Sequence, residues 1–514
     1  MSQLGKSSNQ IWKLLLGMLI LCAIAVRFVL LDIWLIHWLD DDQALMWNAT
    51  AAYAHFMIPE PYFWGQTYGV MMESFLAVPL YWLKVPLNIA LPAATVFLAM
   101  AAYLFVSLLL MKDCHPKTAC AVMASFLLMS WQWDVLTSVP RCFISGLSAA
   151  VIGAVCLNTG KTGRSAMGYS FLCVLSVIMT NSAAVIVGMG YLYFILRIKE
   201  EYRRLPALVG GTACGLLLYI LFKNFYVINA EHNLHPAIGL ELSIETLTAN
   251  IERLPYVMAD FIFIHKGWVV IFLLFLFLLY LVISKRWRVL LLLLSNIVLM
   301  FFLLSMKKTA EFSDDSVTFS QTRMFLCWTY SLLPIVFFWV EETDGVSGFF
   351  LDIEAFFEKK SSAAIICAAI MLIVLSANVL KLKRIDADVQ SQDSRFRYGY
   401  MAHVYRSDDI IDTCKRIDKM AELTNADTVA TGDRRALSYA FDAMYYGKYI
   451  VYNCVYDRRT WNYIALLQNE DRKCLFINGF GNEPIDYETI AFSDKGETPV
   501  QYFKKNYNYD RSPY

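Results

Sequence analysis

Three consecutive carboxylates, Asp40, Asp41 and Asp42, directly follow an apolar run that is long enough to cross a bilayer. A carboxylate at a membrane surface can take a proton from a hydroxyl nucleophile, and general-base catalysis of this kind contributes about 10²–10⁴-fold to a rate. The three charges belong in water or in a polar cavity, because each would cost about 2.5–3.5 kcal/mol inside the hydrocarbon. The triplet is therefore the strongest candidate for a general base, and solvation of a helix end is the alternative interpretation.

Polar residues later in the chain are candidates for substrate contacts. The turn that follows the triplet contains Gln66 and Tyr68, and Glu73 comes shortly afterwards. His232 and His235 follow Glu231, and their spacing would place both imidazoles on one face of a helix, where they could hold a divalent metal. No further ligand is placed by the sequence, and a proline follows the second histidine. We therefore interpret the two histidines as substrate contacts and assign no metal ligands, while the alternative of a divalent metal cofactor stays open.

Two arginines are candidates for binding a phosphate. Arg323 stands at the start of an apolar run, and Arg141 stands at the mouth of another run after Pro140. A guanidinium can bind a lipid phosphate through two hydrogen bonds and stabilise it as a leaving group. The alternative is an arginine that extends to the membrane interface without a ligand.

The composition places these residues in a polytopic membrane protein. The 514 residues are 58% hydrophobic and only 17% charged, and the mean hydropathy is +0.47. A formal net charge of zero gives no indication of a nucleic-acid partner. Most of the 12 cysteines stand in apolar runs, where they are typical of small buried residues, and no zinc-binding spacing is present.

Windows of about 17–25 apolar residues predict an all-α bundle of about eleven membrane spans. These spans are residues 11–31, 87–111, 118–135, 142–157, 166–180, 183–196, 205–222, 268–284, 289–305, 324–340 and 363–380. With the N-terminus in the cytoplasm, the short basic loops fall on the cytoplasmic side, as the positive-inside tendency requires. The first outer loop is then 32–86, and its apolar and small residues at helical spacing predict interfacial helices on the outer membrane surface.

The composition changes after residue 380, from nearly uncharged helices to a charged, mixed segment. We therefore predict a membrane domain over 1–380 and a soluble extracytoplasmic domain over 381–514. In the second domain, Ser407 is a predicted N-cap, and strand-like runs at 428–430, 449–452, 474–477 and 489–492 alternate with helical stretches. This alternation is typical of a small α/β domain with a mostly parallel sheet. One disulfide among Cys414, Cys454 and Cys474 would be allowed there, without an indication of the pair.

The order "span, Asp-Asp, amphipathic helix, aromatic Gly-Gln-x-Tyr-Gly, Glu" in the first outer loop resembles that of the GT-C glycosyltransferases. This superfamily includes protein O-mannosyltransferases, the aminoarabinose transferase of lipid A and polyprenyl-phosphate-sugar-dependent enzymes. The resemblance implies a GT-C helical bundle with Asp41 as catalytic base and with Asp40 and Asp42 as close competitors. Many members have Glu where this chain has Asp42, so the register within the triplet stays open. The step Arg323-Met324-Phe325 resembles an Arg-Tyr-aliphatic step of the family, with Met in place of Tyr.

The resemblance implies a glycosyltransferase of a bacterial inner membrane. Its donor would be a polyprenyl-phosphate sugar, and its acceptor would be a hydroxyl of an envelope glycan or glycolipid such as an O-antigen unit of lipopolysaccharide. Displacement would be direct and inverting, with Asp41 as base and Arg323 and Arg141 on the departing phosphate. Two other functions remain open, an O-antigen polymerase or ligase and a transporter of lipid-linked sugars.

Overall fold

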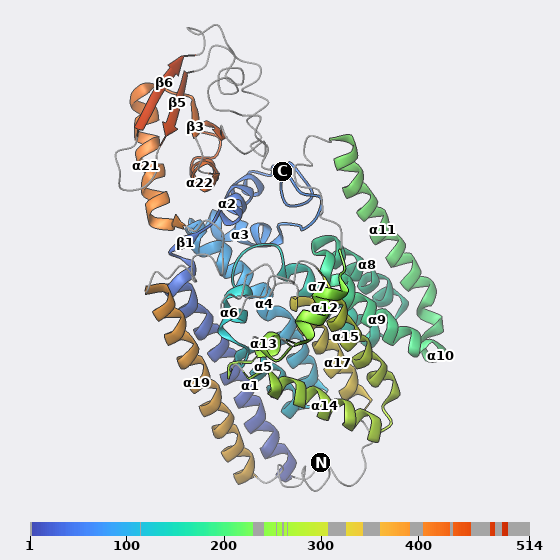
Figure 1. The fold of residues 1–514 in the computed structure, drawn as a ribbon. Coiled ribbons are helices and arrows are strands. Elements are labelled where there is room, and N and C mark those ends of the chain that lie inside the picture. The colour runs from blue at the N-terminus through green and yellow to red at the C-terminus, as the bar shows by residue number, and fades with distance from the viewer. Residues whose placement is uncertain are drawn as a thin grey trace.

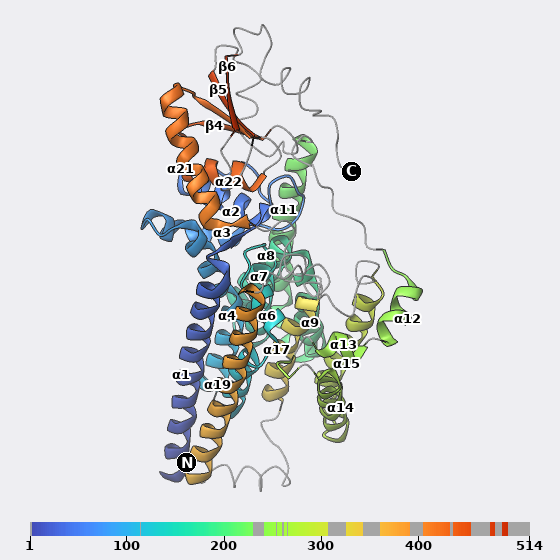
Figure 2. The same ribbon diagram turned by 60° about the vertical axis from the view of Figure 1, so that its left-hand side comes forward.

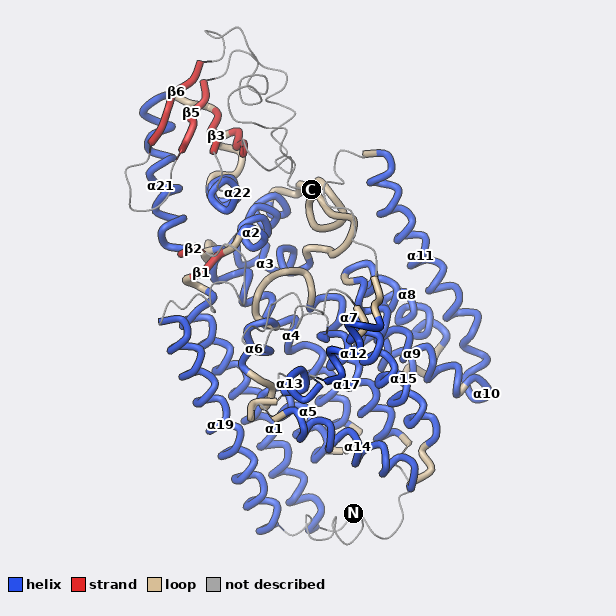
Figure 3. The backbone as a smooth tube through the Cα atoms, viewed as in Figure 1, coloured by secondary structure: helices blue, strands red, loops and turns tan. Residues whose placement is uncertain are grey.

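The computed structural model describes residues 3–113, 115–229, 241–252, 254–259, 262–264, 266–306, 325–342, 360–390, 405–431, 435–453, 473–478 and 486–491. These residues are mostly helical, and nearly all the strands gather at one end of a helical bundle (Figures 1 and 3). The start of α1 lies at the opposite end of the bundle from those strands (Figure 1).

Apolar helices make up the bundle. Among the described residues, five helical stretches are long and apolar enough to cross a membrane, and they include α1 (Gln3–Leu30), α4 (Leu87–Lys112), α11 (Leu205–Ile228), α15 (Trp287–Leu304) and α19 (Lys360–Gln390). Shorter apolar helices pack among them, namely α7 (Ile144–Thr159), α8 (Gly163–Met179), α9 (Ala184–Leu196), α14 (Gly267–Ile283) and α17 (Leu326–Glu341). The chain is therefore a multi-pass membrane protein, as its hydropathy predicts.

The predicted span 118–135 is not one helix. Helix α5 (Pro116–Leu127) ends early, and a separate short helix, α6 (Trp131–Leu136), begins after three intervening residues. Ser130 caps α6, because its hydroxyl accepts a hydrogen bond from Trp133 N at 3.3 Å. The hydropathy window did not detect this break, since the residues on both sides of the serine are apolar.

Glycines allow α8 and α11 to pack closely. A Cβ atom on Gly211 would overlap the Met167 carbonyl oxygen and the Ser170 hydroxyl, and one on Gly215 would lie 2.5 Å from Val174 Cβ. Small residues at a helix interface let two backbones approach, which is how apolar helices associate in lipid. A Cβ on the neighbouring Gly210 would meet no atom within 4 Å.

We expect Gly211→Ala to destabilise the bundle, because overfilling a packed contact costs about 1–3 kcal/mol. Gly210→Ala adds the same methyl group one residue earlier, into open space, and should leave stability unchanged or slightly higher. Thermal unfolding of the two purified variants in one detergent checks this expectation. Equal midpoints for both variants would contradict the close α8–α11 contact.

The predicted first outer loop forms a folded layer at the end of the bundle. After α1, a π-helical turn (Leu31–Leu35) and β1 (Trp38–Leu39) lead into α2 (Asp41–Ala54), and α3 (Met72–Trp82) follows. Every residue from Gln43 to Ala54 is buried, with α3 and the later helix α22 (Arg435–Met444) packed against α2. Protein therefore encloses this helix, because its alanine-rich sequence allows packing on more than one side, and its position at the membrane surface stays a prediction. Exposed apolar side chains occur on and beside α3, at Phe75, Leu76, Trp82 and Leu83.

The strands after α19 form a small α/β unit. It contains α21 (Ser407–Thr424), β3 (Thr428–Thr431), α22, β4 (Ile450–Asn453), β5 (Lys473–Asn478) and β6 (Asp486–Ala491). The sheet order is β4-β3-β5-β6, with β3 parallel to both neighbours and β6 antiparallel to β5. This agrees with the predicted mostly parallel sheet. Arg406, not Ser407, is the N-cap residue of α21, so the predicted cap is one residue too late.

The α/β unit is joined directly to the layer formed by α2 and α3. Strand β2 (Tyr405–Arg406) pairs antiparallel with β1, and Ser407 N donates to His37 O at 2.9 Å. Helix α22 lies against α2, while α19 runs beside α1 in both views (Figures 1 and 2). Helix α19 extends to Gln390, past the predicted domain boundary at 380. The helix that begins at the acidic triplet is therefore held between the bundle and the α/β unit.

Candidate active site

The acidic triplet stands at the N-terminus of α2. Asp40 is the N-cap residue, and its Oδ1 accepts a hydrogen bond from Gln43 N at 2.8 Å. Asp41 and Asp42 occupy the first turn, where the helix dipole favours negative charge. Asp40 is 1% exposed, whereas Asp41 and Asp42 are partly exposed. The triplet thus contains one structural carboxylate and two that solvent can reach.

Arg141 joins two of these carboxylates across a large separation in sequence. It lies between α6 and α7, where its Nη2 pairs with Asp40 Oδ2 and its Nη1 lies 3.1 Å from Asp42 Oδ2. Both terminal nitrogens of the guanidinium therefore hold carboxylates of the triplet, while phosphate binding by Arg141 stays a prediction.

Asp41 contacts the α/β unit. Its Oδ1 accepts a hydrogen bond from Ala436 N, in the first turn of α22, at 3.1 Å. The N-terminus of α22 therefore binds a carboxylate from the N-terminus of α2. The dipole of α22 favours this contact, because the N-terminal end of a helix carries partial positive charge. The position of Asp41 depends on residues that lie almost 400 positions away in the sequence.

Glu73 is completely buried in the first turn of α3, next to Cys142. Burial raises the pKa of Glu73 to about 7, and hydrogen-bonding interactions with its own amide and with Cys142 lower it by less. Burial also raises the pKa of the Cys142 thiol well above its usual range, with smaller contributions from Glu73 and Asp42. The structure therefore brings Glu73 and Cys142 close to the carboxylates held by Arg141. Sequence analysis did not single out Cys142, which resembled any other cysteine of an apolar run.

A second acidic residue, Glu60, fixes the aromatic turn. Glu60 is 2% exposed, and its Oε2 accepts hydrogen bonds from Gly65 N at 2.9 Å and from Tyr226 Oη at 3.1 Å. Lys223, also on α11, donates to Thr67 O at 2.6 Å. These contacts fix the turn that carries Gln66 and Tyr68, both partly exposed. The only sequence signal for Glu60 is a lone acid between Pro59 and Pro61.

We expect Tyr226→Phe to destabilise the aromatic turn, because the buried Glu60 carboxylate loses a hydrogen-bond donor at a cost of about 1–3 kcal/mol. Tyr219→Phe is the matched control on the same helix, since Tyr219 contacts Lys223 through its ring and this contact survives the change. Thermal unfolding and protease sensitivity of residues 59–70 would measure the difference. Identical behaviour of the two variants would show that Glu60 does not need the α11 hydroxyl.

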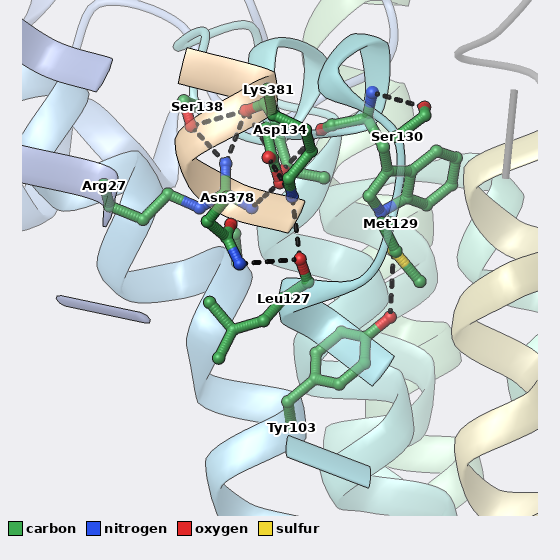
Figure 4. A network of polar contacts seen from close by, with 12 residues as sticks. Arg27, Tyr103, Leu127, Met129, Ser130, Asp134, Ser138, Asn378 and Lys381 are labelled. Atoms are coloured by element: carbon green, nitrogen blue, oxygen red, sulfur yellow. Dashed lines mark hydrogen bonds and ion pairs between the residues drawn. The ribbon is translucent and has the colours of Figure 1, made fainter. Parts of the chain in front are cut away.

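A buried ion cluster lies below this site, and sequence analysis did not predict it. Asp134 of α6 accepts from Arg27 Nη2 of α1 at 3.0 Å and from Lys381 Nζ of α19 at 2.7 Å (Figure 4). Arg27 also donates to Ser138 Oγ at 2.6 Å, and Lys381 donates to Leu127 O at 2.7 Å. Each of the three charged side chains is at most 4% exposed. One carboxylate therefore fixes three segments that lead to the triplet, to Arg141 and to the α/β unit.

The structure gathers some of the predicted site residues and does not describe others. Asp40, Asp42 and Arg141 are in contact, with Glu73 close to them and Gln66 and Tyr68 on the fixed turn. Arg323, His232 and His235 lie outside the described residues, as does Cys454. Within the described ranges, no group of three or more His, Cys, Asp or Glu side chains is placed to hold a metal ion. The arrangement can hold a partly exposed carboxylate in a fixed position beside a cationic side chain.

Comparisons with known proteins give a distant match in three dimensions. No protein-family profile matches the sequence, and no curated protein matches it either. Among solved structures, the fold is similar to an oligosaccharyltransferase from Archaeoglobus fulgidus, crystallised as a complex with zinc and sulfate. The TM-score is 0.39 and the identity is 11%, over 84% of this chain and 62% of that one. The chain thus spans less than two thirds of the length of that protein.

Proposed function

We propose that this chain is a GT-C glycosyltransferase that moves a sugar from a polyprenyl-phosphate carrier to a hydroxyl of an envelope acceptor, such as an O-antigen unit. The supporting observation is the convergence of the acidic triplet, Arg141 and Glu73 at one end of a membrane-helix bundle, under an α/β unit. Carboxylates at this position suit a substrate whose reactive carbon is held at the membrane surface by its lipid.

The proposed reaction is a single displacement at the anomeric carbon. Asp41 takes the proton of the acceptor hydroxyl as the acceptor oxygen bonds to that carbon. The bond between the carbon and the phosphate oxygen breaks, its electron pair leaves with the lipid phosphate, and the configuration inverts. Arg323 is the proposed ligand of that phosphate. Arg141 is the proposed positioning residue, because it contacts Asp40 and Asp42, and Asp42 is the alternative base.

The remaining site residues are proposed to contact the substrates. Glu73 is proposed to line the substrate site from below its surface, because it is completely buried and its pKa of about 7 leaves it partly protonated at neutral pH. Gln66 and Tyr68 stand on the turn fixed by Glu60, and His232 and His235 complete the proposed set.

The proposed orientation follows the loop charges. With eleven spans and a cytoplasmic N-terminus, the triplet and the α/β unit lie outside the cytoplasm of a bacterial inner membrane. Helix α1 carries the chain from the end that holds the N-terminus to the end that holds α2, so these two ends lie on opposite sides of the bundle (Figure 2).

Sugar transfer by the purified chain tests the proposal. The full chain, reconstituted in liposomes with a panel of labelled polyprenyl-phosphate hexoses and an envelope glycolipid, should move label to the glycolipid and release polyprenyl phosphate. Movement of the labelled lipid between leaflets without transfer would support a transporter, and the buried charges of Arg27, Asp134 and Lys381 make that outcome worth measuring. Joining of whole glycan units would support a polymerase or ligase.

A further inference from the structure

A buried pair of polar side chains joins α2 to α22. Asn48 Nδ2 donates a hydrogen bond to Asp442 Oδ2 at 2.7 Å, and the two residues are 1% and 3% exposed. The amide oxygen Asn48 Oδ1 and the other carboxylate oxygen, Asp442 Oδ1, are also buried and have no hydrogen-bond partner within the described part of the chain. Two unpaired acceptors therefore remain on two side chains that already share a hydrogen bond.

A single proton satisfies both of these atoms. An ionised carboxylate only accepts hydrogen bonds, whereas a protonated one also donates. If Asp442 Oδ1 carries the proton, it can donate to Asn48 Oδ1, so that the acid and the amide form two parallel hydrogen bonds. In the alternative, Asp442 is an ionised carboxylate in a buried interface with one hydrogen bond. This state is unfavourable because a charge is buried and because the remaining acceptor atoms have no donor.

The surroundings of the pair favour the neutral acid. Burial raises the pKa of Asp442 to about 7 from an ordinary value of 3.8, and the hydrogen bond from Asn48 lowers it by less. Tyr446, just past the end of α22, is a titratable group that interacts electrostatically with Asp442, and Tyr81 of α3 faces Tyr446 in turn. The elements packed against α22 are α2, α21, β3 and β4. Helix α2 carries the titratable residues Asp41, Asp42 and Tyr53, with His55 at its C-cap, β4 carries Tyr452, and α21 carries Asp408, Asp409, Asp412, Cys414, Lys415, Arg416, Asp418, Lys419 and Glu422. His55 stacks on Tyr446, and Asp41 binds the backbone of Ala436. No ion pair to Asp442 is present among the described residues.

We propose that Asp442 holds a proton shared with Asn48, and that loss of this proton loosens the docking of the α/β unit on the helix that begins at the acidic triplet. The inference makes Asp442 a positioning residue, because α22 also binds Asp41. It does not depend on which reaction the site performs.

The sign of the pH dependence follows from proton linkage. The exposed or unfolded carboxyl titrates near 3.8, and the docked one titrates near 7. Between these two pKa values only the docked state carries the proton. The equilibrium constant for docking therefore falls about tenfold per pH unit as the pH rises, and it becomes constant above about pH 7. The neutral acid therefore stabilises docking fully at a pH below the pKa of the free carboxyl, and this stabilisation is lost at a pH above the pKa of the docked carboxyl.

Infrared spectroscopy and thermal unfolding of the full chain in nanodiscs test the proposal together. The wild type at pH 6 should show the infrared carbonyl band of a protonated carboxyl group, and this band should be absent from Asp442→Asn. The stability of the wild type should fall between pH 5 and pH 7 with the slope expected for the release of about one proton on unfolding, and Asp442→Asn should lack this slope. Glu73 also titrates near 7, so Glu73→Gln must be measured alongside and should leave the Asp442 contribution intact. Asp418→Asn is the control for an acid elsewhere in the α/β unit.

A swap of the two side chains separates this role from general packing. The double variant Asn48→Asp with Asp442→Asn keeps one acid and one amide in the same place, and it should restore both the carbonyl band and the pH dependence. An unchanged band in Asp442→Asn, or equal pH dependence in the wild type and that variant, would overturn the proposal. If Asp442→Asn does not fold, the double variant Glu73→Gln with Glu341→Gln decides it, since a carbonyl band absent from this variant at pH 6 also overturns the proposal.

Discussion

Sugar transfer should fall by about 10²–10⁴-fold when Asp41 is replaced by Asn, the range that loss of a general base commonly costs. Asparagine keeps the size of the side chain and can still accept a hydrogen bond from Ala436 N, so the helix contact survives while the base is lost. Transfer from labelled polyprenyl-phosphate sugar, followed over time in liposomes, measures the change. The thermal stability of the variant should stay close to that of the wild type.

Matched replacements of the other acids identify which carboxylate acts. Asp32→Asn is the control, because Asp32 is an exposed acid at the same end of α1 and should leave transfer unchanged. Asp40→Asn weakens the contact with Arg141 and should lower thermal stability as well as transfer. If the rate of sugar transfer falls only in Asp42→Asn, the general base is Asp42 and not Asp41. Full transfer in all three triplet variants would remove the general-base role from the triplet.

Asp134→Asn should destabilise the chain by about 3–5 kcal/mol, the cost of leaving a buried charge without its partner. The change removes the carboxylate that both Arg27 and Lys381 contact, and leaves two buried cations facing each other (Figure 4). Arg27 and Lys381 sit near the ends of α1 and α19, so the loss should also disturb the segments that lead to the triplet and to the α/β unit. The drop in thermal midpoint measures the effect.

Asp386→Asn is the matched control for this second experiment. Asp386 lies on the same helix as Lys381 and accepts a hydrogen bond from Gln390 on the exposed side, so its loss should change stability by less than about 0.5 kcal/mol. Adding Lys381→Met to Asp134→Asn removes one of the two stranded cations and should recover part of the lost stability. A midpoint for Asp134→Asn equal to that of Asp386→Asn would mean that the cluster carries no stabilising charge pairing.

The sequence predicted features that depend on short stretches of chain. Apolar runs predicted the bundle, and alternating runs predicted the strands at 428–431, 450–453 and 473–478 within a residue or two. The sequence predicted that Asp40, Asp41 and Asp42 lie between the first span and a following helical segment, and the structure adds that they begin that helix as its N-cap and first turn. The break at Ser130 was missed because hydropathy averages over a window longer than the capping motif.

The partners of the acids could not be predicted from the sequence. Glu60 binds Tyr226, Asp40 binds Arg141 and Asp134 binds Lys381, and between 101 and 247 positions separate the members of these pairs. A single sequence carries no signal for which distant side chains meet, because burial of apolar surface decides how the helices pack and the polar pairs form where that packing leaves them. Helix α2 shows the same limit, since its burial from Gln43 to Ala54 depends on α22, a distant segment, as well as on the neighbouring α3.

By itself, the sequence determined that the chain spans a membrane several times, that an acidic triplet follows the first span, and that an α/β unit comes last. These are properties of residue type and spacing, which act within one helix or strand. Tertiary structure alone decided that Arg141 binds two acids of the triplet, that α22 binds the third, and that Asp442 meets Asn48 in a buried interface. These contacts form only when folding brings distant segments together, and they decide which carboxylate is buried, paired or open to a substrate.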